Sequence, residues 1–236
     1  MVCNSGVRVT PTIGNQVHHF AEHGLYDGLF TMRDEETGTF WDHLTGEAVY
    51  GPLVGTSLEV GSLEYSLAGQ VLENHPEALI TISDQILWEN EALGIDGLLK
   101  RRNRGLSKMF SSTVEQEDDR LPTMEIGLGI WSGAKARYYP YTEVVDAGNA
   151  VLDDFNGYQV LIYLDPEIQV LSAVYVDAES LKWQGDVLHL SNGYKLSNSQ
   201  FHDASGQKLN MKRPLQTFSR WYGFSLTFLQ TEIFKN

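Results

Sequence analysis

The stretch AVLDDFNGYQVLIYLD, residues 150–165, decides the fold class, because two strand-like runs flank the pair Asn156-Gly157. Asn-Gly tolerates positive φ at both central positions of a tight turn, so the pair predicts a β-hairpin. The same signal recurs at Asn192-Gly193, between DVLHLS and YKLS. Two hairpin signals close together predict antiparallel β-structure in this half of the chain.

Short β-type runs also occupy the start of the chain. VRVTPTI, NQVHHFAEH and GLFTMRD are separated by Gly, Asn and Pro, and MEIGLGIWSG resumes the pattern after Pro122. Such runs, bounded by turn residues, are typical of strands. We therefore expect β-structure on both sides of the middle of the chain.

Helical periodicity is confined to three places. Apolar residues at i, i+4 and i+8 predict a helix over 63–75, ending before Pro76. One or two helices are expected within 84–110, after a short strand at 78–82. A closing helix, amphipathic or largely buried, is expected over 215–231, with a short strand after it at 232–234.

These patterns predict an α+β fold, mainly β, made of two related β-rich units that are each closed by a helix. The expected units span 1–82 and 123–236, because strands, a helix and a brief strand follow one another in both. Residues 83–122 are expected to form a partly helical connection. Its segment STVEQEDDR has few apolar side chains to offset the entropy of ordering and reads as a loop or linker.

Charge and hydropathy narrow the class of partner. The chain has 17 Lys and Arg against 31 Asp and Glu, a formal net charge of −14. Such a surface repels nucleic acid, so we expect no nucleic-acid partner, and the basic run at 100–104 reads as a solvated helix face. No apolar run reaches the roughly 18 residues of a membrane span, so a soluble chain without a transmembrane segment is expected. Whether its partner is a small molecule or a protein stays open.

The most distinctive segment is RDEETGTFWDHLTGEAVYGPLVGTSL, residues 33–58. It resembles the prokaryotic domain of unknown function 3179 family, with the pattern D-x-x-T-G-S-x-W-x-x-x-T-G-E-A-x-x-G-P-x-x-G. The matching residues are Asp34, Thr37, Gly38, Trp41, Thr45, Gly46, Glu47, Ala48, Gly51, Pro52 and Gly55, with Thr39 in place of the serine. The segments 133–160 and 218–234 are similar to the family's later motifs, although the closing proline is missing.

The resemblance also bears on the N-terminus. The family commonly has C-x-x-C-x-[ST]-G, and Cys3, Ser5 and Gly6 match its second half. The first cysteine would then precede Met1, so we expect the sequence to lack an N-terminal piece of its first unit. Relatives with selenocysteine at this motif imply a redox role. Relatives with export or lipoprotein signals favour an extracytoplasmic over a cytoplasmic location.

Two functions follow, and whether the protein is an enzyme stays open between them. In a C-x-x-C pair one thiolate attacks a disulfide and the other resolves it, or both hold a soft metal. The first hypothesis is therefore a thiol-based redox or metal-handling protein centred on Cys3, the remaining half of that motif. The alternative is a non-catalytic ligand- or partner-binding β-rich module, in which Cys3 is a buried structural residue.

A transition metal is the one candidate cofactor. His19 and His23 would share a face of a strand, because side chains alternate, and could join Cys3 around zinc or copper. An ordinary polar strand edge explains the same histidines. No phosphate-binding glycine motif, nucleophile elbow or H-E-x-x-H pair occurs in the sequence.

Carboxylates are the other candidate catalytic groups. Asp34 and Glu47 are the main ones, with Asp42 as a further candidate. Glu47 follows Gly46, and small neighbours leave its carboxylate reachable. The competing interpretation is a turn in which Thr45 and Glu47 bond backbone N–H groups.

Trp41, Thr45, Gly46 and Arg137 complete the candidate site as binding residues. Trp41 fits either stacking against a ligand or a place in the core. Arg137 fits either anion binding or a structural ion pair with a neighbouring carboxylate, Asp153 or Asp154.

Overall fold

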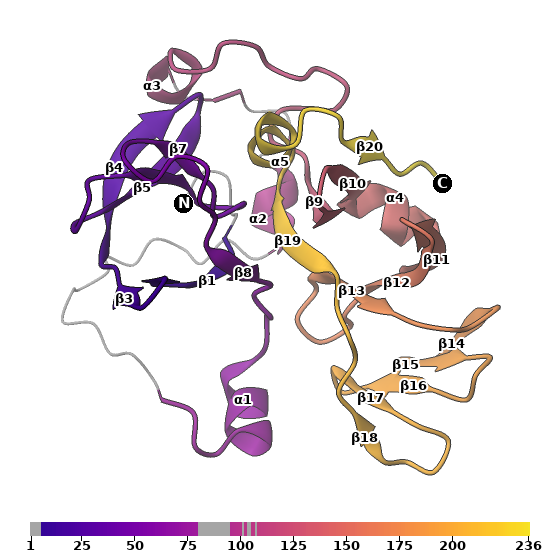
Figure 1. Ribbon diagram of the computed structural model, residues 1–236. Helices are drawn as coiled ribbons and strands as arrows, with labels where there is room; N and C mark the ends of the chain where they lie inside the picture. The colour runs from indigo at the N-terminus through magenta and orange to yellow at the C-terminus, as the bar shows by residue number, and fades with distance from the viewer. Residues whose placement is uncertain (1–5, 80–94, 101, 103–104, 107) are drawn as a thin grey trace.

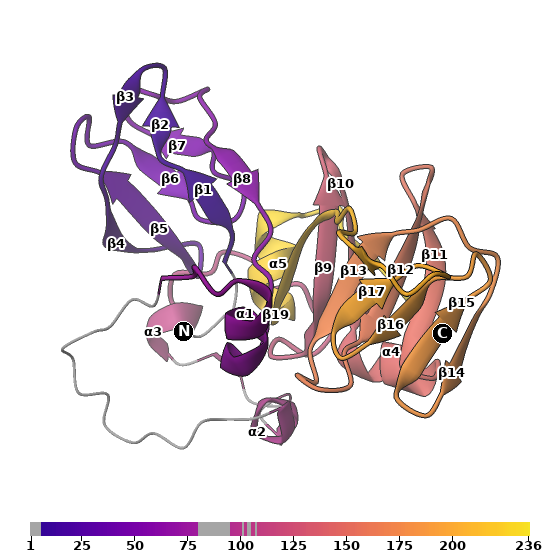
Figure 2. The same ribbon diagram turned by 90° about the horizontal axis from the view of Figure 1, so that it is seen from below.

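Figure 1 shows the computed structural model, which describes residues 6–79, 95–100, 102, 105–106 and 108–236. The fold is α+β and mainly β, as expected. Its strands gather in an N-terminal lobe, residues 6–61, and a C-terminal lobe, residues 121–236. Figures 1 and 2 both show the lobes side by side, with α5 (Trp221–Thr227) on the side of the C-terminal lobe that faces the N-terminal lobe. The expectation of two related units stays a prediction.

The N-terminal lobe is built on an antiparallel meander in the order β4-β5-β6-β7. Its strands are β4 (Phe20–Tyr26), β5 (Leu29–Asp34), β6 (Phe40–Asp42) and β7 (Ala48–Tyr50). Two short pairs accompany it, namely β1 (Arg8–Thr10) with β8 (Glu59–Gly61) and β2 (Thr12–Ile13) with β3 (Gln16–Val17). Their apolar side chains pack around Trp41, Ala48 and Leu58, which form a small core.

The C-terminal lobe holds three sheets, with strand orders β19-β9-β10-β20, β11-β12-β13 and β14-β15-β16-β17-β18. The strands are β9 (Ile126–Ser132), β10 (Lys135–Pro140), β11 (Ala150–Phe155), β12 (Tyr158–Leu164), β13 (Leu171–Tyr175), β14 (Leu181–Gln184), β15 (Val187–Leu190), β16 (Lys195–Ser197), β17 (Gln200–His202), β18 (Lys208–Leu209), β19 (Leu215–Arg220) and β20 (Glu232–Ile233). Helix α4 (Tyr141–Asp146) follows β10 directly.

Buried apolar side chains are concentrated in the C-terminal lobe. One cluster includes Ile130, Ile162 and Phe218, and a second includes Leu161 and Leu188. Helix α5 packs on β9 because Gly129 has no side chain: a Cβ there would lie 2.1 Å from the ring of Phe224. A glycine in a strand interior commonly marks such a close approach.

A strap, residues 62–75, joins the lobes and contains α1 (Ala68–Asn74). Ser62 Oγ donates to the carbonyl of Pro214 at 3.0 Å and accepts the N–H of Gln216 at 3.0 Å. The connection contains α2 (Ile95–Lys100) and α3 (Lys108–Ser111). No helix in the described ranges is long and apolar enough to cross a bilayer.

Both hairpin predictions are confirmed. β11 and β12 pair across Asn156 and Gly157, which have φ of 56° and 79°. β15 pairs with β16 across the second Asn-Gly, where only the glycine, Gly193, has positive φ, at 88°. Residues 112–120 contain no helix or strand, as expected of the linker.

The helix expected over 215–231 is wrong in its first part. Leu215–Arg220 is strand β19, which pairs antiparallel with β9, and only Trp221–Thr227 is helical. Residues 216–220 are all buried, so the strand shows no apolar–polar alternation and its spacing resembles a helix face. Helix α1 also begins later than expected, at Ala68. The strand expected at 78–82 falls largely outside the described residues, and the two that are described are not in a strand.

Candidate functional site

One turn is built twice in succession in the N-terminal lobe. The first joins β5 to β6 with Asp34, Thr37 and Gly38, and the second joins β6 to β7 with Asp42, Thr45 and Gly46. Within each turn, the aspartate accepts the threonine N–H, at 2.6 Å in the first and 2.7 Å in the second. The glycine N–H donates to the aspartate carbonyl, at 3.1 Å and 3.0 Å. Both turns are therefore closed by residues three and four positions after the aspartate.

The aspartate of the first turn is fully buried. Asp34 Oδ2 accepts the indole N–H of Trp41 at 2.8 Å, and the hydroxyl of Thr37 donates to the same carboxylate. Burial acts to raise the pKa of Asp34, but the hydrogen bonds from Trp41 and Thr37 outweigh it and lower the pKa to about 2. The carboxylate is thus ionised at neutral pH although it is enclosed.

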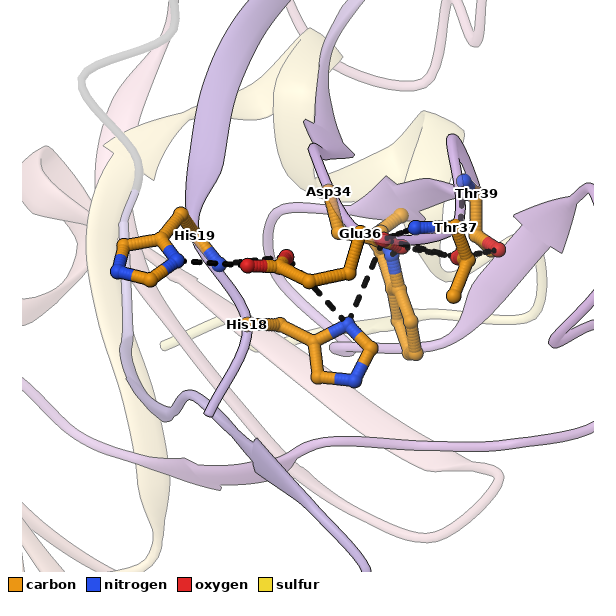
Figure 3. Close-up of polar contacts among 7 residues, drawn as sticks. His18, His19, Asp34, Glu36, Thr37 and Thr39 are labelled. Atoms are coloured by element: carbon orange, nitrogen blue, oxygen red, sulfur yellow. Dashed lines mark hydrogen bonds and ion pairs between the residues drawn. The ribbon is translucent and has the colours of Figure 1, made fainter. Parts of the chain in front are cut away.

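A buried histidine faces this carboxylate. His18 lies just before β4, where its N–H donates to the carbonyl of Pro11 at 2.7 Å. Its Nδ1 is 3.4 Å from Asp34 Oδ1 and 3.8 Å from Glu36 Oε2. Figure 3 shows its ring directed at both carboxylates. Within the described part of the chain, this buried Nδ1 makes no hydrogen bond of normal geometry.

The neighbouring histidine makes a different contact with the same glutamate. His19 Nδ1 lies 2.6 Å from Glu36 Oε1, and the N–H of His19 donates to Oε2 at 2.9 Å. This hydrogen bond raises the pKa of His19 and lowers the pKa of Glu36. Glu36 therefore stands between an exposed histidine and a buried one, as Figure 3 shows.

The spacing of the three groups suits a metal ion. Ligand atoms of His18, Asp34 and Glu36 all lie within 4.8 Å of one another. Atoms bound tetrahedrally at about 2.1 Å from Zn²⁺ lie roughly 3.4 Å apart, because an edge of a tetrahedron is about 1.6 times its centre-to-corner distance. The separations of 3.4 Å and 3.8 Å from His18 Nδ1 are close to that value. Imidazole and carboxylate are both ligands of zinc and related ions.

Asp34 and Glu36 lie within the most distinctive segment of the sequence, residues 33–58, and His18 precedes it. Residues 1–226 match the family described as "Protein of unknown function (DUF3179)". The chain belongs to this family. No curated protein and no solved structure matches it.

In this DUF3179 member, the structure brings two of the candidate residues, Asp34 and Trp41, into contact, and a catalytic or binding role for either stays a prediction. It adds His18 and Glu36, which the sequence interpretation did not select. A signal for Asp34 was present in the sequence: the repeat of D-x-x-T-G after eight residues, at Asp34 and at Asp42, marks two equal turns. His18 carries no such mark, because its contact with Asp34 arises only on folding.

The two predicted histidine ligands are not part of this group, although His19 contacts its Glu36. His23 is exposed and packs edge-on against Phe40, with ring centroids 4.5 Å apart. β4 is bulged between Glu22 and Leu25, so simple alternation from His19 to His23 does not hold along it. Among the described residues, the potential metal group contains neither histidine. Cys3 lies outside the described residues, and its role stays a prediction.

The T-G-E-A loop forms a turn, as in its competing interpretation, but among the described contacts only Thr45, and not Glu47, bonds a backbone N–H through its side chain. Thr45 Oγ1 accepts the N–H of Glu47 at 3.2 Å, and the Glu47 side chain is exposed. Gly46 is buried with φ of 70°, and a Cβ there would lie 2.8 Å from Val60 Cγ1. A role for Glu47 in catalysis, or for Thr45 and Gly46 in binding, stays a prediction.

Arg137 forms the ion pair that was expected as its structural role. Its Nη1 lies 2.6 Å from Asp153 Oδ2 and also donates to the carbonyl of Asp154 at 2.8 Å. Nε and Nη2 bind Glu232 of β20, so the residue ties β10, β11 and β20 together. Burial acts to lower the pKa of Arg137, but its bonds to Glu232 and Asp153 hold the pKa above its ordinary value.

Proposed function

We propose that this protein handles a divalent transition metal, which His18, Asp34 and Glu36 hold in the N-terminal lobe. The single observation that carries the proposal is the position of His18 Nδ1, buried 3.4 Å and 3.8 Å from two carboxylate oxygens without a normal hydrogen bond. A buried polar atom of this kind needs a partner, because leaving it unpaired costs about 1–3 kcal/mol. A metal ion between the three ligands would supply that partner.

The adjacent His19 provides a comparison for the distances around His18. Where an imidazole simply pairs with Glu36, the distance is 2.6 Å, as for His19. The distances from His18 to Asp34 and Glu36 exceed the usual 2.7–3.2 Å of an N–H···O bond. These two separations suit ligands around a common centre better than a hydrogen bond of normal length.

Charge and coordination capacity support the same assignment. A neutral imidazole with two carboxylates carries two negative charges, which a divalent ion offsets. An ionised carboxylate has about four lone-pair positions, so the donors Thr37 and Trp41 leave Asp34 with capacity for an ion. These donors would also hold the carboxylate in place, as outer partners do in metal sites.

The chemistry of such a site depends on its open positions. Three protein ligands leave room for water or a substrate on zinc, whereas a fourth protein ligand closes the site. Glu36 is partly exposed, at 19% of its side chain, while His18 and Asp34 are enclosed. Solvent therefore reaches the group from the side of Glu36, and we assign no reaction beyond metal binding.

Titration with Co²⁺, followed by its visible absorption bands, tests the proposal. The wild-type chain is expected to bind one ion, and His18→Ala to weaken binding by more than about tenfold. Glu36→Gln tests the second ligand, and an unfolding curve of each variant checks that it is folded. His23→Ala is the matched control, because that histidine is exposed and outside the group. Unchanged affinity in folded His18→Ala, or binding lost only in Cys3→Ser or His23→Ala, would contradict the proposal.

The thiol half of the original hypothesis is a separate prediction. A redox role predicts that the thiol of Cys3 is reactive in the native protein. Thiol titration of the native and the denatured protein measures it. An unreactive Cys3 in the native protein would remove the redox role and leave metal binding untouched.

The alternative, a non-catalytic binding module, predicts a buried and unreactive Cys3. In that case Cys3→Ser destabilises the protein by less than about 1.5 kcal/mol and changes no activity. Denaturant unfolding of the variant measures the first quantity.

A further inference from the structure

A cavity of about 240 Å³ lies beneath the strap, against the C-terminal lobe. The strap and α1 line it from one side, and β13, β19 and the turn between β16 and β17 line it from the other. An empty apolar cavity of about 150 Å³ is large enough for benzene, so this one accepts a somewhat larger molecule. It is separate from the group around His18, none of whose residues lines it.

Contacts along the strap hold the cavity closed on one side. Besides the bonds of Ser62, the amide nitrogen of Gln70 donates to Ser199 Oγ at 3.2 Å and to Glu167. The ring of Tyr65 packs edge-on to that of Phe218, with centroids 6.3 Å apart. The strap thus touches the C-terminal lobe at its start, its middle and its helix, and the cavity lies between them.

The walls of the cavity are chemically divided. One part is apolar and consists of Leu63, Val71, Leu128, Val170, Leu171 and Phe218. The other part carries hydroxyls, side-chain amides and the guanidinium of Arg213, which is the only Lys or Arg among the described lining residues. A pocket with an apolar wall and a few placed polar groups is typical of small-molecule sites.

Arg213 is positioned by the lobe and has a weak carboxylate partner. Its Nη1 donates to Ser172 Oγ at 2.8 Å and to the carbonyl of Ala173 at 3.2 Å, which fixes the guanidinium. Its Nε lies 3.3 Å from Glu64 Oε1, but the Glu64 side chain is 68% exposed. The Arg213 side chain itself is only 19% exposed, so solvent screens this pair mainly from the Glu64 side. A carboxylate that enters the cavity can therefore displace Glu64 from Arg213.

We propose that this cavity binds a small organic carboxylate with an apolar body. The carboxylate would pair with Arg213 in place of Glu64, and the body would lie against Leu128, Val170 and Phe218. Asp165 also lines the cavity, but its Oδ1 already accepts three donors, including Ser199 Oγ at 2.8 Å. These hydrogen bonds stabilise the Asp165 carboxylate but leave its charge in place, so the guanidinium of Arg213 is the group with which a bound carboxylate would pair.

Calorimetric titration of the full chain with benzoate, and with benzyl alcohol as the neutral analogue, tests this inference. Benzoate is expected to bind saturably with a millimolar dissociation constant. Glu64→Gln removes the competing carboxylate and is expected to tighten benzoate binding by about threefold, while Arg213→Met weakens it by more than about tenfold. Neither substitution should alter the binding of benzyl alcohol in the same titration. If Glu64 and Arg213 had purely structural roles, the two substitutions would not change benzoate binding in opposite directions.

Val71→Phe is the variant that keeps the test decisive if Arg213→Met fails to fold. It fills the cavity from the strap side and leaves Arg213 with its partners, so benzoate binding should disappear. Saturable binding that survives Val71→Phe, weaker binding in Glu64→Gln, or no saturable binding by wild type would overturn the proposal. The Co²⁺ titration should be unchanged in all three variants, which separates this inference from the metal site.

Discussion

The two turns that begin at Asp34 and Asp42 share a local design but differ in their surroundings. Each aspartate accepts the N–H and the hydroxyl of the threonine three residues later. Asp42 is half-buried and also accepts the N–H of Leu44, whereas Asp34 is enclosed between Trp41 and His18. A short sequence code therefore suffices to build the turn. Residues that are more distant in sequence, Trp41 and His18, make the copy at Asp34 a candidate site.

Replacing each aspartate by alanine should separate the two turns most clearly. Asp34→Ala leaves the buried N–H of Trp41 and the N–H of Thr37 without their acceptor, which should lower the free energy of unfolding by about 3 kcal/mol. Asp42→Ala should lower it by only about 1 kcal/mol, because water reaches that half-buried turn. Urea unfolding measures both. Equal losses would show that the surroundings add nothing to the turn.

The glycines of the two turns should show the opposite order. Gly38 and Gly46 have φ of +73° and +70°, so alanine at either position costs about 1–2 kcal/mol in backbone strain. A Cβ at Gly46 would also lie 3.1 Å from the carbonyl oxygen of Leu58, whereas at Gly38 its nearest neighbour is the mobile end of Arg33, at 3.2 Å. We expect Gly46→Ala to be the more destabilising by about 1 kcal/mol. Thermal unfolding of the pair checks the order, and a larger loss in Gly38→Ala would contradict it.

Acid should weaken the first turn through its aspartate. Burial raises the pKa of Asp34, but its hydrogen bonds from Trp41 and Thr37 bring the pKa down to about 2, below its ordinary value of 3.8. A lowered pKa contributes stability that is present above pH 4 and is lost as the pH falls toward 2. Asp34→Asn should remove about 2 kcal/mol of the pH dependence in this window. Urea unfolding at pH 4 and at pH 2 measures it, and an unchanged dependence would contradict the assignment.

The smallest effect is expected at Glu47, which follows the second turn. Its side chain is exposed, so Glu47→Gln should change the free energy of unfolding by less than about 0.5 kcal/mol. Co²⁺ binding should also stay the same, since the proposed metal ligands lie around the first turn. Loss of metal binding in Glu47→Gln would instead assign the metal site to the T-G-E-A loop.

Local signals in the sequence predicted the β-rich fold well where a turn determines the structure. Asn156-Gly157 provides positive φ at two successive positions, and the hairpin follows from it. The strand Leu215–Arg220 could not be predicted in this way. It is buried almost throughout, so its residue pattern lacks the alternation that marks a half-exposed strand. Pairing with β9, about ninety residues earlier, decides its structure.

The candidate site was predictable to a similar extent. Asp34 and Trp41 lie in one short segment, and their link through the turn is local. His18 lies next to Asp34 because β4 pairs with β5 and places Phe20, two residues after His18, opposite Asp34. The alternation rule selected His19 and His23 instead, and the bulge in β4 defeats that rule. Contacts of this kind depend on the packed lobe rather than on spacing along a strand.

The strand order β19-β9-β10-β20 has a consequence for synthesis of the protein on the ribosome. β9 and β10 emerge early in the C-terminal lobe, but the strands that cover their outer edges come only at Leu215–Arg220 and Glu232–Ile233. Until then the nascent hairpin keeps free amide and carbonyl groups on both sides, which invites pairing with other chains. Translation that stalls before Leu215 would therefore release an aggregation-prone product, and chaperones that shield strand edges should associate with it.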